Sequence, residues 1–243
     1  MKLPISALAI FLLSAQIMLA QDSKESKLDG SIDLGLTLLQ GNSEATNGAA
    51  NFIIKHIWEN QELELNSQYL SVRNYDINNN IAETTSRLYR SELQYNYFLS
   101  NDKEKYIWTN LGYRQDKPTG LIKRNTGGFG FGYQLLLFKD CDLNFEAGLS
   151  YVSEEKSTTT QSTVGRASAE LDWELSEALS MISSTELLNG NAIRTIIQDF
   201  GLRYDLNTDW FLKLSNNISY DGYPANNKLS TDSRWHITLG TNF

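Results

Sequence analysis

The feature that most constrains the fold is a strict alternation of apolar residues with small or polar ones. In residues 32–38 every second residue is aliphatic, and in residues 129–133 aromatic residues alternate with glycine. Residues 143–149 and 210–220 repeat the pattern. A period of two places successive side chains on opposite faces of a strand, whereas a helix has a period of 3.6. The sequence therefore predicts an all-β protein whose strands each carry one apolar face.

The connections between the alternating segments indicate which way the apolar face points. We count about twelve strands, each near the ten or so residues that a tilted membrane strand needs. Long connections are expected at residues 40–46, 74–84, 116–125, 153–162, 189–192 and 221–230, and short ones near residues 60, 101–104, 139–141, 176–177 and 207–209. Short periplasmic turns and longer extracellular loops are typical of outer-membrane barrels. We therefore expect an antiparallel transmembrane β-barrel, with both termini in the periplasm, rather than a soluble sandwich.

Tyrosine and tryptophan residues on the apolar parity support the same interpretation. They fall mostly near the ends of the expected strands: Trp58, Tyr69, Tyr89, Tyr95, Tyr97, Tyr113, Tyr133, Tyr151, Trp173, Tyr204, Trp210 and Tyr220. These side chains favour the bilayer interface, where the ring is apolar and the polar tip reaches water. Their positions predict contact with outer-membrane lipid.

The last residues form an alternating strand that ends on an aromatic residue. Counted back from Phe243, the outward positions include Leu239, Ile237 and Trp235. The pattern resembles the C-terminal signal by which the barrel-assembly machinery recognises its substrates. The last strand must pair with the first, because an open sheet edge cannot be left in hydrocarbon. We expect these four residues to act in closure and assembly.

The first residues are typical of a secretory signal peptide. Lys2 precedes an apolar run over residues 5–13, and more apolar residues follow as far as Ala20. A basic start, a short apolar core and a small residue before the cut predict a signal peptide over residues 1–20. The alternative is a membrane anchor, but the run is shorter than the roughly 20 residues that span a bilayer. We expect residues 21–29 to be a short periplasmic segment, residues 30–243 to be the barrel, and the destination to be the outer membrane.

Composition narrows the function classes. The net charge is −8, which disfavours a nucleic-acid partner because phosphate binding needs clustered basic residues. The mean hydropathy of −0.37 does not argue against a membrane barrel, because its strands alternate between lipid-facing and lumen-facing residues. Cys141 is the only cysteine, so no internal disulfide can form.

Catalytic chemistry is not indicated. The two histidines, His56 and His236, lack metal-ligand spacing, and we expect no metal, no cofactor and no catalytic residues. The rival interpretation is an outer-membrane lipid hydrolase that uses serine, histidine and asparagine. Ser233 and Asn242 are near His236 in sequence, but Ser233 and His236 are three residues apart and would face opposite sides of a strand. We therefore expect a protein that is not an enzyme.

Charged residues fall on the parity opposite the apolar face. They are Asp33, Lys55, Glu64, Arg90, Glu92, Arg114, Glu146, Arg166, Glu170, Asp172, Arg203, Lys213 and Arg234. Arg or Lys facing hydrocarbon at mid-bilayer costs roughly 2–4 kcal/mol, so we expect these side chains to line the lumen. They could form a salt-bridge network that fills the barrel, or they could line a narrow channel for small solutes or ions. A receptor role carried by the outer loops is a third alternative.

Glycines at positions 112, 128, 130, 132, 148, 201 and 240 share the inner parity. Small residues on the inner wall leave space beside it, so they indicate some water-filled volume.

Several segments resemble a known family. The segments that carry the resemblance are residues 30–35, the Gln40-Gly41-Asn42-Ser43 turn, residues 93–99 and the Gly-x-Gly-x-Gly-Tyr strand at 128–133. Together they are similar to the salt-induced outer-membrane protein family, also called domain of unknown function 481. The resemblance covers nearly all of the chain after residue 20. It implies an outer-membrane barrel and no catalytic residues or cofactor.

Overall fold

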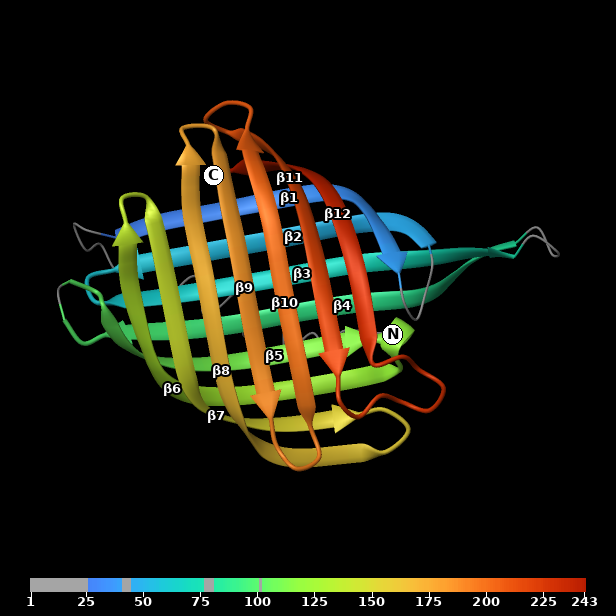
Figure 1. Cartoon of the computed structure of the whole chain (residues 1–243). Helices are drawn as coiled ribbons and strands as arrows, with labels where there is room; N and C mark the ends of the chain where they lie inside the picture. The colour runs from blue at the N-terminus through green and yellow to red at the C-terminus, as the bar shows by residue number, and fades with distance from the viewer. Residues whose placement is uncertain (1–25, 41–44, 77–80, 101) are drawn as a thin grey trace.

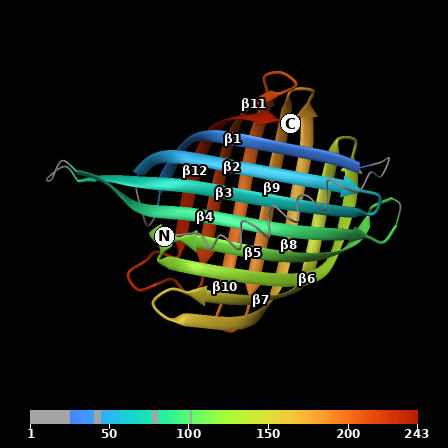
Figure 2. The ribbon, with the colours of Figure 1, turned by 180° about the vertical axis from the view of Figure 1, so that it is seen from behind.

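The computed structural model describes residues 26–40, 45–76, 81–100 and 102–243. Twelve antiparallel strands run through this part of the chain and close into a single barrel. Each strand pairs with its neighbours in sequence, and the first pairs with the last (Figures 1 and 2). The predicted all-β barrel of about twelve strands is confirmed.

The strands are long for a barrel wall. Their bounds are β1 Ser26–Gln40, β2 Ala45–Trp58, β3 Gln61–Asp76, β4 Ile81–Phe98, β5 Lys105–Asp116, β6 Leu121–Phe138, β7 Cys141–Glu155, β8 Thr159–Ser176, β9 Leu179–Asn189, β10 Arg194–Asp205, β11 Trp210–Asp221 and β12 Thr231–Asn242. A short 3₁₀ turn, η1 at Lys117–Thr119, joins β5 to β6. β1 begins within residues 21–29, the segment that the sequence predicts to precede the barrel.

The seam between β1 and β12 closes the wall. Their register places Leu34 opposite Leu239 and Ile32 opposite Thr241. At its end, Gly30 and Phe243 exchange two backbone hydrogen bonds of 3.0 Å. A Cβ at Gly30 would lie 2.5 Å from the Phe243 ring, so glycine leaves the room that the terminal ring occupies. The backbone groups of both edge strands are therefore paired.

The two faces of the wall differ as the alternation predicts. Leu34 is 61% exposed on the outside, whereas its neighbour Asp33 is 3% exposed on the inside. Phe129 and Phe131 also lie exposed on the outer surface. Because paired residues of antiparallel strands share a face, the register extends this division around the whole barrel. The outer surface is thus apolar, whereas the inner surface carries charged residues among buried apolar ones.

The connections differ from the predicted loops. Residues 121–125, expected in a loop, belong to β6, and residues 153–155 and 159–162 belong to β7 and β8. Pairs such as Glu155 with Thr159 continue the ladder. The polar side chains there predict loops. A strand that extends beyond the lipid-facing apolar surface, however, needs only backbone pairing and no apolar face. Among the described connections, the stretch 222–230 remains long as predicted.

The turns at the end of the barrel opposite residues 222–230 are tight. Glu59 and Asp140 take positive φ angles of 45° and 66°, in the left-handed region that such turns require. In the turn between β4 and β5, the Ser100 hydroxyl and the Glu104 amide donate to Asp102. These hydrogen bonds hold the pKa of the Asp102 carboxyl below its usual value. We call this the short-turn end, and the opposite end, which carries η1 and residues 222–230, the loop end.

No helix within the described ranges is long and apolar enough to cross a membrane. The expected signal peptide, residues 1–20, lies outside the described residues.

A closed barrel should resist dodecyl sulfate until it is heated. We expect unheated protein to migrate differently from boiled protein on a gel, because the closed ladder has no edge from which to unravel. Identical migration of both samples, for protein extracted from membranes, would contradict the fold.

Deletion of Phe243 tests the seam. The deletion removes both hydrogen bonds to Gly30, each of which contributes roughly 1 kcal/mol, together with the ring packed on Gly30. We expect the heat-modifiable fraction to fall several-fold, and Phe243→Tyr, which keeps the ring and the backbone, to restore it. An unchanged yield after deletion would show that closure does not depend on this residue.

Candidate functional site: the barrel interior

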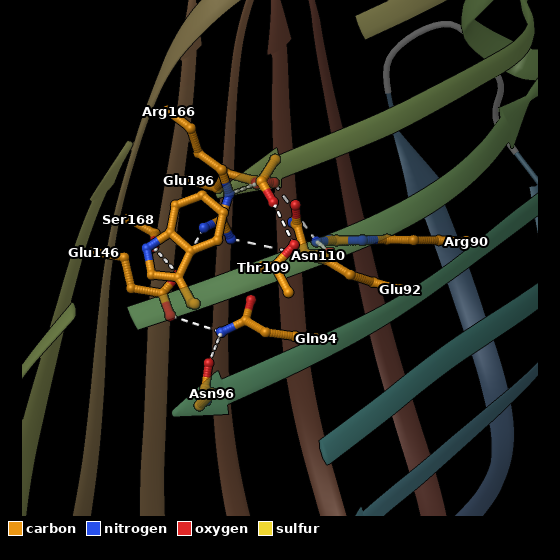
Figure 3. A network of polar contacts seen from close by, with 12 residues as sticks. Arg90, Glu92, Gln94, Asn96, Thr109, Asn110, Glu146, Arg166, Ser168 and Glu186 are labelled. Atoms are coloured by element: carbon orange, nitrogen blue, oxygen red, sulfur yellow. Dashed lines mark hydrogen bonds and ion pairs between the residues drawn. The ribbon is translucent and has the colours of Figure 1, made fainter. Parts of the chain in front are cut away.

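A belt of charged side chains crosses the barrel. We define the cross-barrel belt as Arg90, Glu92, Glu146, Arg166, Glu186 and Asp199. Arg166 on β8 contacts Glu146 at 2.6 Å and Glu186 at 2.8 Å on the adjacent strands. Its guanidinium also lies 3.7 Å from Glu92 on β4, a strand that is not its neighbour (Figure 3). The contact between β8 and β4 therefore passes through the interior.

Arg90 extends the belt from β4. It lies 3.2 Å from Glu92, 3.6 Å from Glu186 on β9 and 4.0 Å from Asp199 on β10. Nearby, the Gln94 amide donates to Glu146 at 2.7 Å, which links β4 directly to β7 (Figure 3). The sequence predicts the inward position of four belt residues but gives no sign that they meet.

The inner glycines correct one expectation. Gly130 and Gly148 do not leave water-filled space, because a Cβ there would lie 2.6 and 2.8 Å from the Trp108 ring. Gly132 faces the ring of Tyr106, and Gly240 faces that of Phe211. Trp108 is 0% exposed, and Arg166 lies over it at 4.4 Å. These glycines hold inward-facing rings, as glycine does where a cross-strand neighbour is aromatic.

A second charged cluster lies toward the loop end. Asp116, with 0% exposure, accepts from Arg114 at 2.7 Å and from Arg234 on the distant strand β12 at 2.8 Å. Arg124 donates to Glu154 at 2.7 Å and to Thr195 on β10 at 3.0 Å. We call these residues the loop-end cluster. Their contacts again join strands that are not neighbours.

Lys156 ties this end to the loops. Its ammonium group contacts Glu154 at 2.7 Å and both Asp221 and the Tyr223 carbonyl at 2.6 Å. The Tyr223 hydroxyl in turn donates to the Asn191 carbonyl. The connections 156–158, 190–193 and 222–230 are thus held together above the loop-end cluster.

Cavities lie on both sides of Arg114 and Arg124. One, which we call the chamber, has about 450 Å³ of space, part of it open to the rest of the lumen, and lies between these arginines and the belt. The other has about 360 Å³, also partly open to solvent, and reaches Pro224 and Leu229 in the long connection. The two arginines border both spaces.

The interior toward the short-turn end is more open and more acidic. Lys55 lies 3.1 Å from Glu64 and 3.7 Å from Glu62. Glu170 and Asp172 are exposed on the inner face of β8. Asp172 lies directly opposite Asp142 of β7, an arrangement of like charges that is unfavourable unless water screens it. We call this region the vestibule.

The remaining predicted residues stand apart from these groups. Asp33 accepts a hydrogen bond of 2.6 Å from Asn51. Arg203 pairs with Asp205 at 2.8 Å and lies 3.9 Å from the Phe211 ring. Lys213 lies beside Gly201.

Sequence reasoning missed Asp116, Arg124, Glu154, Glu186 and Asp199. Glu186 and Asp199 share the inner parity of their strands, so a complete count along β9 and β10 would have found them. The others stand in or beside segments expected to be loops.

The arrangement expected for the rival hydrolase is not formed. The Ser233 hydroxyl accepts from Asn216 at 3.1 Å on the outer parity, while His236 is on the inner parity of the same strand. Among the described residues, no group of three or more His, Cys, Asp or Glu is placed to hold a metal ion.

Comparison with known proteins gives the family. The model described as "Protein of unknown function, DUF481" matches residues 32–243. The chain belongs to this family. The resemblance to the salt-induced outer-membrane proteins is thereby confirmed, since that is a common name for the family. A search of curated proteins finds no match.

A solved outer-membrane porin shares the fold. The NanC porin, in a rhombohedral crystal form, superposes with a TM-score of 0.55 at 10% identity, over 86% of this chain and 98% of its own. The KdgM porin gives a TM-score of 0.49 at 14% identity, over 88% and 99% of the two chains. OmpT of Vibrio cholerae gives 0.43 at 7% identity, over 90% and 97%. The superposition on the NanC porin shows that this family member has the fold of a porin barrel.

Arg166→Met tests the belt. The change leaves Glu146 and Glu186 facing each other without their shared cation, and loss of one partner of a buried charge network costs roughly 3–5 kcal/mol. We expect the temperature at which the barrel loses its heat-modifiable mobility to fall. Lys139→Met, in an exposed turn, should leave it unchanged. Equal stability of the two variants would show that the belt contributes nothing to the fold.

Proposed function

We propose that the protein is an outer-membrane barrel that forms a narrow hydrophilic channel for small solutes or ions, without catalysis. The observation that carries this proposal is that polar spaces follow one another along the interior of the barrel. The vestibule leads to the belt, the chamber follows, and the second cavity reaches the loops. Membership of the family and the porin-type fold support it. Export depends on the predicted signal peptide, residues 1–20, and assembly on the C-terminal strand.

The chemistry of the inner face supports transport over a purely structural role. A barrel that needs only to be filled can use apolar side chains, whereas charged groups must be desolvated at a cost that their pairing only partly offsets. Here the inner face of neighbouring strands carries Arg90, Arg114 and Arg124 side by side. Such a wall is compatible with passing water and ions.

The orientation is part of the proposal. An even number of strands puts the first and last strand ends on one side, and here that is the short-turn end. Short turns in the periplasm and the loop end outside would follow the usual arrangement of these barrels. The acidic vestibule would then face the periplasm.

A second candidate is a structural or surface-receptor barrel with a plugged lumen. The observation that favours it is the belt, whose ion pairs connect β4 with β8, β9 and β10 through the middle of the barrel. If these contacts persist, they block the path between the vestibule and the chamber.

Single-channel recording in a planar bilayer separates the two candidates. We expect small conductance steps for the wild type. Conductance should be several-fold larger for Arg90→Ser with Glu186→Ser, because this neutral double change shortens two side chains of the belt. The control is Lys123→Ser with Glu155→Ser, which removes an exposed ion pair of 3.0 Å on the outer surface. No conductance from any of the three heat-modifiable proteins would reject the channel and favour the plugged barrel.

A further inference from the structure

The wall of the chamber contains a row of three arginines. The register places Arg90 opposite Arg114, and Arg114 opposite Arg124, on β4, β5 and β6. Like charges directly opposite one another are destabilising. Arg166 also borders the chamber, whereas Glu92 and Glu186 are the carboxylates that line it. The lining therefore has four arginines and two carboxylates, while Asp116 and Glu154 pair with Arg114 and Arg124 from outside it.

Small residues form the floor beneath this row. Gly112 and Thr126 are paired in the next inward-facing position, and Asn110, Gly128 and Ser150 are aligned in the one after it. A Cβ at Gly128 would collide with the Ser150 hydroxyl and lie 2.8 Å from Asn110 Oδ1. The two oxygens thus converge over a glycine that leaves room between them.

Both oxygens lack a partner among the described residues. Ser150 is 2% exposed and Asn110 is 4% exposed. Nevertheless, Ser150 Oγ neither donates nor accepts a hydrogen bond, and Asn110 Oδ1 accepts none. Both residues line the chamber. A buried polar atom without a partner costs roughly 1–3 kcal/mol, so a bound group that satisfies both would stabilise the site.

We propose that the chamber binds a small tetrahedral oxyanion that retains a proton, of which inorganic phosphate is the simplest. The arginine row and the Ser150 hydroxyl donate to its oxygens. Asn110 Oδ1 accepts from its O–H group, because the Asn110 amide nitrogen is already engaged with Glu92 at 2.7 Å. Guanidinium groups suit phosphate geometry.

The anion enters as a free ion, because the chamber lies inside the barrel and away from lipid. The proposal does not depend on conduction, since an ion that enters from one end can bind in a plugged barrel. Binding and conductance are therefore separate measurements, and either can fail without the other.

The first experiment measures binding of inorganic phosphate and sulfate to the barrel in dodecyl maltoside by calorimetry, at constant ionic strength and pH 7. Phosphate carries an O–H group at this pH and sulfate carries none. We expect saturable binding of one phosphate per chain and at least tenfold weaker binding of sulfate. No heat of phosphate binding in the millimolar range, with heat-modifiable protein, would overturn the site. Equal affinities would overturn the role assigned to Asn110.

Variants then locate the ion. Ser150→Ala removes an unpartnered hydroxyl without disturbing the fold, and phosphate affinity should fall about tenfold, a typical loss for a hydrogen bond to a charged group. Arg114→Gln should lower it further. Lys139→Gln, which removes one positive charge at an exposed turn, should have no effect. If Ser150→Ala and Arg114→Gln bind phosphate like the wild type, the ion is adventitious and the chamber is not its site.

Discussion

Closure of the β1–β12 seam is the constraint on which the other features depend. A sheet with a free edge would leave a row of unpaired backbone groups, and those groups cannot be satisfied in an apolar phase. The reciprocal hydrogen bonds between Gly30 and Phe243 complete this pairing at the end of the chain. Once the wall is closed, every second residue must face inward, whatever its chemistry. The contents of the interior are therefore a consequence of closure as much as of local sequence.

That consequence explains how the interior is filled. Large rings at Tyr106, Trp108 and Phe211 face glycines on neighbouring strands, so that ring and glycine together occupy one side-chain space. Trp108 then provides a surface for Arg166, and this guanidinium gathers Glu92, Glu146 and Glu186 from three strands. Apolar packing and the ion-pair belt are therefore coupled through one contact.

The sequence predicted the wall well and the interior less well. Period-two alternation identifies the face of Asp33 or Glu146 without knowledge of any partner, because parity is a local property. The curvature of the barrel and the stagger of its strands determine which inward residues come into contact. Neither property can be recognised from a short stretch of sequence. The pair between Arg234 and Asp116 joins residues that are 118 positions apart. Arg124 and Glu154 were placed in or beside loops for another reason: polar hairpin arms beyond the apolar belt look like loops in sequence, although their backbones stay paired.

The distribution of charge along the interior relates the belt to the chamber. In the vestibule, carboxylates such as Asp142 and Asp172 lie opposite each other and depend on water for screening. In the chamber the lining itself carries more arginines than carboxylates, and each arginine of the row is paired with a carboxylate beside it. The belt lies between these regions and contains both signs, with two arginines and four carboxylates. An ion of either sign would meet one favourable and one unfavourable region on the way through. The side chains of the belt would therefore control whether an ion passes through the barrel. An anion that reaches the chamber would remain bound there.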